Sequence, residues 1–156
     1  MATQVHAISQ AAYALEAERI GCADFPPLRE TLDDLRQSSD CFFVFQQSGR
    51  IVGALSFDRS VAPITITRLV VRLDYHRRGV AAALIAAMEE RVAPIARFKV
   101  TTAQNNQPAV LLYQRCGYTA VETSTSLEGI LLLHLVKAVV SVPVNPVSPR
   151  VDLRPA

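Results

Sequence analysis

The sequence predicts a mixed α/β protein whose sheet contains a parallel pair of strands. Three observations support this fold class. Apolar residues recur at helical spacing early in the chain, two β-rich runs joined by a short turn follow, and strands then alternate with helices. A short turn produces an antiparallel hairpin, whereas a strand, a helix and another strand in succession produce a parallel pair.

Two helices and a hairpin make up the predicted first part of the chain. Apolar side chains repeat at helical spacing over residues 8–19, and Gly21 is a suitable end for that helix. Residues 24–40 predict a second helix, because two prolines pre-set its first turn and its leucines share one face. Residues 41–60 form two β-rich runs around a Ser-Gly turn and predict a hairpin.

The remainder of the chain predicts alternating strands and helices. Residues 64–71 predict a strand rich in β-branched side chains, and residues 80–92 predict a helix whose apolar residues are spaced four apart. The parallel pair is therefore expected here. The other predicted elements are a strand at 98–103, a helix at 108–116 that ends at Gly117, and a final strand pair at 118–124 and 129–140.

The length of 156 residues fits a single domain, which we place at residues 1–140. Four of the nine prolines fall after residue 142. Prolines at that density do not allow a central strand, so we expect residues 141–156 to form an extended or disordered arm. Such an arm could also lie across a neighbouring subunit.

Composition and charge exclude several classes of protein. The chain is 50% hydrophobic and 19% charged, as in ordinary globular domains. There is neither an apolar run of about 18 residues nor an N-terminal basic segment followed by an apolar one. The net charge of +2 is too small to indicate nucleic-acid binding. The three cysteines indicate neither a disulfide framework nor a metal site. We expect a cytoplasmic protein without membrane or nucleic-acid partners.

The connection between the strand at residues 64–71 and the following helix carries Arg77, Arg78 and Gly79. A helix N-terminus has unpaired N–H groups and about half a positive charge, so it attracts anions. Gly79 lets the backbone approach a ligand closely, and arginine suits phosphate oxygens. The sequence therefore predicts a phosphate site. Neither a GK[ST] nor a GxGxxG pattern is present, so other phosphate loops fit poorly.

The stretch "LVVRLDYHRRGVAAAL" resembles the acetyl-CoA-binding motif of the GNAT superfamily of N-acetyltransferases, Q/R-x-x-G-x-G/A after a strand. Residues 76–81 fill the pattern, with His76 in place of the usual Gln or Arg. The second signature of the family is an asparagine, an alanine three residues on, and a tyrosine before a glycine and an aromatic residue. It is matched by Asn106, Ala109, Tyr113, Gly117 and Tyr118. The resemblance covers about residues 9–137.

The resemblance implies a GNAT-like fold: a mixed, mostly antiparallel sheet with a central parallel strand pair and helices on both faces. Relatives usually begin with a strand, whereas this chain starts almost directly in a helix. We therefore expect either a sheet that is one strand short or a brief strand at residues 3–7. A homodimer is common in the family and is also possible here.

The resemblance also implies acetyl-CoA as the cofactor. The strand backbone at 69–71 would face the pantetheine arm, residues 77–82 the pyrophosphate, and Asn106 the pantetheine or adenine side. Structural roles stay open, since the arginines could be surface residues, Asn106 could cap a helix, and Tyr113 could be a core aromatic. The implied cofactor-binding residues are Leu69, Val70, Val71, His76, Arg77, Arg78, Gly79, Val80, Ala81, Ala82, Asn106 and Tyr113.

By the same resemblance, an acceptor amine would attack acetyl-CoA directly in a ternary complex. Tyr113 would be the catalytic acid that protonates the departing thiolate, and a strand N–H would stabilise the carbonyl oxygen. Many relatives carry a glutamate base at the positions of Thr65 and Thr101. A water chain, or an amine that binds already neutral, would also serve. Candidate replacements for that base are Asp58, Glu122 and His134.

The segment at residues 16–40 holds seven acids against three arginines, in the region where relatives select the acceptor. Opposite charge favours a cationic acceptor. The sequence therefore predicts an acetyl-CoA-dependent N-acetyltransferase acting on a primary amine of a small molecule or peptide. Two other interpretations stay open: a catalytically weak acyl-CoA-binding or sensing module, and a nucleic-acid-binding domain that uses the arginines of residues 68–78.

Overall fold

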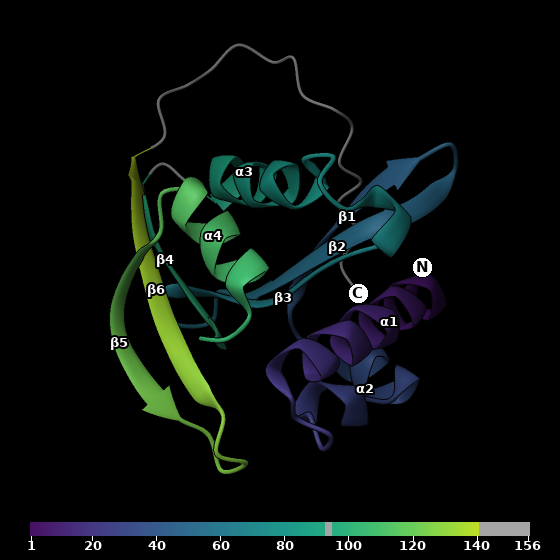
Figure 1. The fold of residues 1–156 in the computed structure, drawn as a ribbon. Helices are drawn as coiled ribbons and strands as arrows, with labels where there is room; N and C mark the ends of the chain where they lie inside the picture. The colour runs from purple at the N-terminus through teal and green to yellow at the C-terminus, as the bar shows by residue number, and fades with distance from the viewer. Residues whose placement is uncertain (93–94, 141–156) are drawn as a thin grey trace.

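The computed structural model describes residues 1–92 and 95–140, which form a six-stranded sheet with helices on both faces (Figure 1). The arm expected at residues 141–156 lies outside the described residues. In chain order the elements are α1 (Ala2–Ile20), the 3₁₀ helix η1 (Pro26–Arg29), α2 (Leu32–Gln37), β1 (Cys41–Gln47), β2 (Arg50–Asp58), β3 (Ile64–Val71), the 3₁₀ helix η2 (Leu73–Tyr75), α3 (Val80–Val92), β4 (Ile95–Ala103), α4 (Gln107–Arg115), β5 (Thr119–Thr125) and β6 (Leu131–Val140).

The strands of the sheet follow the order β1-β2-β3-β4-β6-β5. Four neighbouring pairs are antiparallel, and β3 pairs with β4 in parallel. The chain connects these two parallel strands through α3, because parallel neighbours need a crossover. The predicted mixed, mostly antiparallel sheet with one central parallel pair is confirmed.

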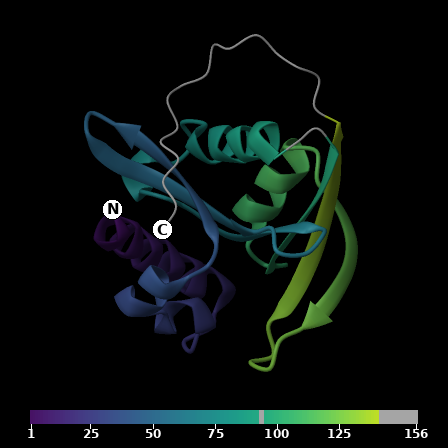
Figure 2. The ribbon, with the colours of Figure 1, turned by 180° about the vertical axis from the view of Figure 1, so that it is seen from behind.

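Each face of the sheet has its own apolar core. Leu84 and Met88 of α3 pack with Phe98 of β4 on the face that α3 and α4 cover, and all three are 0% exposed. Val5 of α1 and Leu35 of α2 are buried in a second apolar core. The ribbon views show α1 and α2 on the side of the sheet opposite α3 and α4 (Figures 1 and 2). Within residues 1–92 and 95–140, no helix has both the length and the apolar composition to cross a bilayer.

The first residues of the chain are helical, so the expectation of a brief strand at residues 3–7 is wrong. They belong to α1, which ends at Gly21 with a left-handed φ of 70°. Val5 and Ile8 are buried against the sheet from this helix. The segment therefore buries apolar side chains on one helical face instead of pairing along a strand. In the described residues, the first strand is β1.

The expected single helix at residues 24–40 is also wrong, because the segment forms two short helices. Glu30 has extended backbone angles, with φ −61° and ψ 123°, and ends η1. Thr31 then starts α2 with a capping box: its hydroxyl accepts from the Asp34 N–H at 3.1 Å, and its own N–H donates to the Asp34 carboxylate at 2.8 Å. The leucine spacing continues across this break and does not reveal it.

The two parallel strands separate toward their C-terminal ends. Their pairing joins residues 64–66 of β3 to residues 98–100 of β4. Beyond this, β3 stays paired with β2 as far as Val71, and β4 stays paired with β6 as far as Ala103. A gap therefore opens in the middle of the sheet between two strands that are each held from their outer side.

Candidate active site

A cavity of about 690 Å³ is lined by the end of β3 and the loop that follows it, by α1 and α3, and by residues 106–115 in and before α4. We call it the larger cavity. Of the twelve predicted cofactor-binding residues, Arg78 does not line it; its guanidinium carbon lies 5.1 Å from the centre of the Tyr75 ring. The other eleven line the cavity, namely Leu69, Val70, Val71, His76, Arg77, Gly79, Val80, Ala81, Ala82, Asn106 and Tyr113.

The loop between β3 and α3 presents unpaired backbone N–H groups to this cavity. Arg77 and Gly79 have positive φ angles of 60° and 79°, and the space where a Gly79 Cβ would stand is open to at least 4 Å. The first bond of α3 runs from the Ala83 N–H to the Gly79 carbonyl at 2.9 Å. The N–H groups of residues 80–82 therefore have no partner within the helix, and N–H groups in this position attract anions.

His76 connects this loop to the end of β3. Its Nε2 lies 2.9 Å from the Val71 carbonyl oxygen, to which a protonated Nε2 donates. Arg72 is held to the Asp74 carboxylate by two contacts of 3.0 Å. Both contacts stay within the turn between β3 and α3, so they fix the direction in which the chain enters the helix. The imidazole therefore contributes to the shape of the loop.

The inner edge of β3 supplies further backbone groups. The Arg72 N–H points toward β2, because it donates to the Val52 carbonyl at 2.8 Å. Backbone groups alternate in direction along a strand, so the N–H groups of Leu69 and Val71 point toward β4. The pairing of β3 with β4 ends at residue 66, so it leaves these two N–H groups unused. They are placed to bind a ligand in the gap.

A second cavity of about 290 Å³, the smaller cavity, meets the first. It lies between α1, η1, β3, β4 and the loop from β5 to β6. Tyr113 is at the junction and is 5% exposed. Burial raises the pKa of its hydroxyl above the ordinary value, so the group stays protonated at neutral pH. The residues that line both cavities are Glu16, Leu69, Asn106, Ala109 and Tyr113.

Asn106 occupies the N-cap position of α4, but its side chain makes no capping hydrogen bond. Instead, its Oδ1 accepts a hydrogen bond from Arg19 Nη1 of α1 at 3.4 Å, and the residue is 6% exposed. The sequence left open whether Asn106 caps this helix. Asn106 stands at the N-cap position, but its side chain does not cap the helix. The side chain belongs to the junction of the cavities.

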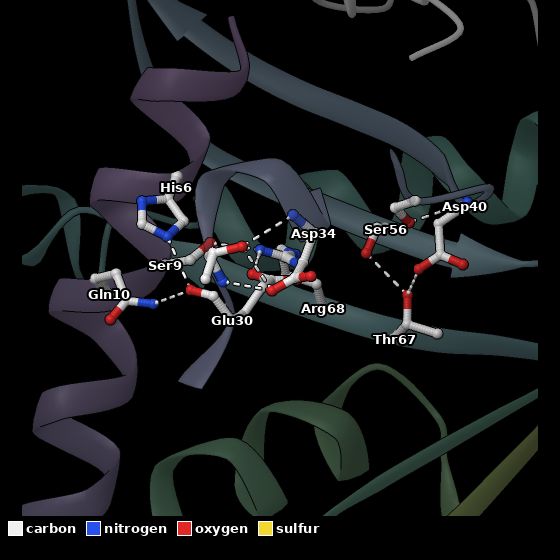
Figure 3. Close-up of polar contacts among 11 residues, drawn as sticks. His6, Ser9, Gln10, Glu30, Asp34, Asp40, Ser56, Thr67 and Arg68 are labelled. Atoms are coloured by element: carbon white, nitrogen blue, oxygen red, sulfur yellow. Dashed lines mark hydrogen bonds and ion pairs between the residues drawn. The ribbon is translucent and has the colours of Figure 1, made fainter. Parts of the chain in front are cut away.

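An ion pair between buried Arg68 and half-buried Glu30 supports the wall of the smaller cavity (Figure 3). Arg68 is 8% exposed, and its two terminal nitrogens contact the Glu30 carboxylate, with Nη1 at 2.9 Å from Oε2. The same Nη1 donates to the Ser9 hydroxyl at 2.8 Å, and the Gln10 amide donates to the Glu30 carbonyl at 3.1 Å. These contacts tie β3, the end of η1 and α1 together. In the sequence, Arg68 belonged to a cluster of arginines with no indicated partner.

Most acids of residues 16–40 have other partners. Of the seven, Glu16 is the one that lines either cavity, while Glu128 of the loop from β5 to β6 also lines the smaller one. The acidic residues that line the smaller cavity are thus these two. Of the other six, Glu18 is exposed, and the remaining five have partners: Arg29 for Asp24, Arg68 for Glu30, Arg36 for Asp33, Thr31 for Asp34, and Thr67 for Asp40.

None of the three replacement bases suggested by the sequence lines either cavity. Asp58 accepts from the Ser60 N–H at 2.8 Å, and Glu122 is exposed on β5. His134 has both ring nitrogens bonded, to Thr101 at 2.9 Å and to Ser124 at 2.7 Å. Its contacts are those of a satisfied structural histidine. Of the two threonines that replace the glutamates of relatives, Thr101 lines the smaller cavity and Thr65 lines neither.

Glu16 is a candidate that the motif analysis did not single out as a site residue. With Ala12, Leu15 and Arg19 it shares one face of α1, at spacings of three and four, and all four residues line the larger cavity. The sequence contained a signal for Glu16, namely a carboxylate beside apolar residues on a helix face that packs inward. Burying a charged group costs free energy, so such a group indicates a functional role.

The comparisons with known proteins agree with this fold. A family model described as "Acetyltransferase (GNAT) domain" matches residues 20–139. The chain belongs to this family, so the resemblance found in the sequence is confirmed. The UPF0157 protein YqkA of Bacillus subtilis (strain 168) is 33% identical over 132 residues, which cover 85% of this chain and 38% of that protein. The chain therefore spans little more than a third of the length of this curated relative.

Three solved structures illustrate the likeness in fold. An aminoglycoside 6'-N-acetyltransferase complexed with coenzyme A has a TM-score of 0.68 at 13% identity, covering 91% of this chain and 92% of that one. The ribosomal-protein-S18-alanine N-acetyltransferase of Escherichia coli has a TM-score of 0.61 at 18% identity, covering 87% and 90%. An acetyltransferase of Thermus thermophilus reaches 0.65 at 21% identity, covering 88% and 90%. At these identities the likeness establishes the fold alone.

Proposed function

We propose that the protein is an N-acetyltransferase that moves an acetyl group from acetyl-CoA to a primary amine by direct attack in a ternary complex. The observation that carries this proposal is the junction of the two cavities at Tyr113. Two substrates held in separate cavities that meet at one side chain can react without a covalent enzyme intermediate. Membership of the GNAT acetyltransferase family supports acetyl transfer in general.

The larger cavity is the proposed site of acetyl-CoA. The free N–H groups of residues 80–82 and the Arg77 guanidinium bind the pyrophosphate, because a helix N-terminus and an arginine both favour phosphate oxygens. The N–H groups of Leu69 and Val71 bind the pantetheine arm along the inner edge of β3. The coenzyme A complex of the structurally similar aminoglycoside 6'-N-acetyltransferase supports a CoA ligand for this fold.

Tyr113 is the proposed catalytic acid. A β3 N–H stabilises the carbonyl oxygen as it becomes negative, a contribution of about 3 kcal/mol in comparable sites. Tyr113 then donates its proton to the CoA thiolate as the carbon–sulfur bond breaks. Its position between the cavities supports this role, and the raised pKa means that the hydroxyl carries its proton at neutral pH.

The smaller cavity is the proposed acceptor site, and its charge favours a cationic amine. Glu16 and Glu128 line it, whereas the charge of Arg68 is balanced by Glu30. The rings of Tyr13 and Phe25 also line it and meet edge-on at 6.2 Å between centres. Aromatic faces attract cations. A polyamine, an aminoglycoside or a peptide amine has the required charge.

A second candidate function is an acyl-CoA-binding or sensing module with weak catalysis. Thr65 and Thr101 favour it, because many relatives carry a glutamate base at these positions. Such a module binds acetyl-CoA but releases no CoA when amines are added. Measuring CoA release therefore distinguishes the two functions, whereas measuring acetyl-CoA binding does not.

The proposed cofactor site is tested by isothermal titration of acetyl-CoA into the wild type, Gly79→Glu and Gly49→Glu. Gly79 and Gly49 have similar φ angles of 79° and 75°, and both have open space where a Cβ would stand. The two substitutions therefore impose similar backbone strain, but only residue 79 lines the cavity. We expect Gly79→Glu to weaken binding by more than about 100-fold, because a carboxylate there repels the pyrophosphate.

Gly49→Glu is the control and should bind acetyl-CoA like the wild type. Circular dichroism and thermal melts of both variants establish that they are folded. Equal binding by all three proteins, or no binding by the wild type, contradicts the proposed site. Release of CoA, followed with a thiol reagent in the presence of spermidine, kanamycin or trialanine, then separates the enzyme from the binding module.

A further inference from the structure

Glu16 of α1 lies where the two cavities meet. Of the α1 residues that line the larger cavity, it is the one that also lines the smaller cavity. The other residues common to both cavities are Leu69, Asn106, Ala109 and Tyr113. Among these five, Glu16 is the one side chain that can carry a negative charge at neutral pH, since Tyr113 stays protonated.

The proposed reaction needs a proton acceptor at such a junction. A primary amine has a pKa near about 10, so it arrives as an ammonium ion and cannot attack until it loses a proton. The replacement bases suggested by the sequence lie outside both cavities, and Thr101 and Thr65 cannot accept a proton at neutral pH. A carboxylate that touches the acceptor cavity can bind the ammonium ion and then take its proton.

We propose that Glu16 is the catalytic base of the acetyl transfer, binding the acceptor ammonium ion at the junction of the cavities and removing its proton. This inference rests on the proposed function. The neutral amine nitrogen attacks the thioester carbonyl carbon, and the carbon–sulfur bond breaks. One proton passes from the ammonium ion through Glu16 to solvent. A second proton leaves the nitrogen as the amide forms and balances the one that Tyr113 gives to the thiolate.

The surroundings of Glu16 fit a base that works near neutral pH. The carboxylate is half-buried, and burial raises its pKa above the ordinary value, while the Asn106 side chain and Arg19 oppose the shift only in part. Asn106 is itself engaged by Arg19 through its Oδ1. A carboxylate with a raised pKa holds a proton better than an exposed one, so it removes protons from amines more effectively.

Among the residues that the structure describes, the neighbouring titratable groups leave this carboxylate without a buried positive partner. Tyr13 on the same helix has its pKa raised by burial to about 12, and Tyr113 on α4 is neutral as well. Arg68 of β3, across the smaller cavity, is paired with Glu30. The cation that lowers the pKa of Glu16 is Arg19, one turn along α1, which is exposed. An acceptor ammonium ion is thus the partner that the site lacks.

The raised pKa also predicts how stability depends on Glu16. A carboxyl group whose pKa is higher in the folded state than in the unfolded state stabilises the fold at low pH. This stabilisation is lost as the pH rises through the pKa of the group in the folded protein. At pH 7 the ionised group is therefore unfavourable to folding. Glu16→Gln should melt at the same temperature as the wild type or a higher one, whereas removal of a merely structural carboxylate lowers the melting temperature.

The test compares Glu16→Gln with Glu18→Gln, an exposed glutamate of the same helix that lines neither cavity. CoA release with spermidine, kanamycin and trialanine is measured between pH 5 and 9, together with acetyl-CoA binding. For Glu16→Gln we expect a fall in kcat of about 100-fold, loss of the acidic limb of the pH profile, and acetyl-CoA affinity within about threefold of the wild type. Glu16→Asp should recover part of kcat, and Glu18→Gln should behave as the wild type.

The possible outcomes distinguish a failure of the role proposed for Glu16 from a failure of the proposed acetyltransferase function. If the wild type turns over and Glu16→Gln keeps its kcat and pH profile, the role of Glu16 is overturned while the proposed function stands. If Glu16→Gln lowers both the melting temperature and the activity, the proposed role of Glu16 is also overturned. If the wild type binds acetyl-CoA but releases no CoA with any of the three amines, both the enzymatic function and the role of Glu16 are overturned. Failure to bind acetyl-CoA removes the cofactor site as well.

Discussion

The two cavities of this protein are built in different ways. The larger one takes the backbone N–H groups of its proposed phosphate end from one continuous stretch, residues 69–82, while α1 and residues 106–115 complete its lining. The smaller one is assembled from α1, η1, β3, β4 and the loop from β5 to β6, and side chains supply its polar groups. The phosphate-binding loop of the larger cavity is therefore a local feature of the chain, whereas the polar groups of the smaller cavity come together only when distant elements pack.

The difference explains how such a fold can keep one cofactor and change its acceptor. Backbone groups at a helix N-terminus bind phosphate whatever the neighbouring side chains are, provided that the loop keeps its course. Side chains that converge from distant elements can be replaced one at a time. Substitutions in the larger cavity should therefore affect cofactor binding, and those in the smaller cavity should affect domain stability and acceptor choice.

The largest expected effect is on the smaller cavity, at its buried ion pair. Glu30→Gln removes the charge that balances Arg68, whose side chain is 7% exposed. Because an uncompensated buried charge is costly, we expect the free energy of unfolding to fall by about 3 kcal/mol in chemical denaturation. Acetyl-CoA affinity in the folded fraction should stay within about threefold of the wild type, since the larger cavity does not depend on this pair.

Two further variants control this prediction. Asp24→Asn breaks the exposed pair with Arg29 and should leave stability without measurable change, because solvent screens such pairs. The double variant Glu30→Leu with Arg68→Met replaces both charges by apolar groups and should regain most of the lost stability. A loss of acetyl-CoA binding that exceeds the loss of stability in Glu30→Gln would show that the two cavities are not independent.

The next effect concerns Tyr113, where the cavities meet. Tyr113→Phe removes the proposed acid but keeps the ring, so we expect kcat for CoA release to fall about 100-fold with little change in acetyl-CoA affinity. Tyr118→Phe is the matched control. Its ring lies 5.7 Å from that of Tyr113, and its hydroxyl donates to Glu89 in the core. This control should lose stability and keep kcat, and equal kcat in both variants would exclude Tyr113 as the acid.

The difference between the two cavities also explains how much of the site could be predicted from the sequence. The strand, loop and helix of the larger cavity were predicted because their determinants are contiguous: β-branched residues, a glycine and an alanine-rich helix. The contacts that support the smaller cavity and its junction with the larger one join residues far apart, 38 positions for Arg68 with Glu30 and 87 for Arg19 with Asn106. Local patterns carry no information on such pairs. The break at Thr31 was missed for a related reason, since a capping box competes with the leucine spacing that continues through it.

The smallest effect separates the two adjacent arginines of the loop. Arg77 lines the larger cavity, whereas Arg78 lies over the Tyr75 ring and does not line it. Both side chains are exposed, so neutralising either one changes the long-range potential by the same amount. We expect Arg77→Gln to weaken acetyl-CoA binding about tenfold and Arg78→Gln about twofold, because a charge-assisted hydrogen bond is lost only in the first. Titrations at several salt concentrations test this directly. If the two variants lose the same affinity at every salt concentration, the arginines act only through net charge, and binding in the larger cavity depends on the backbone N–H groups of residues 80–82.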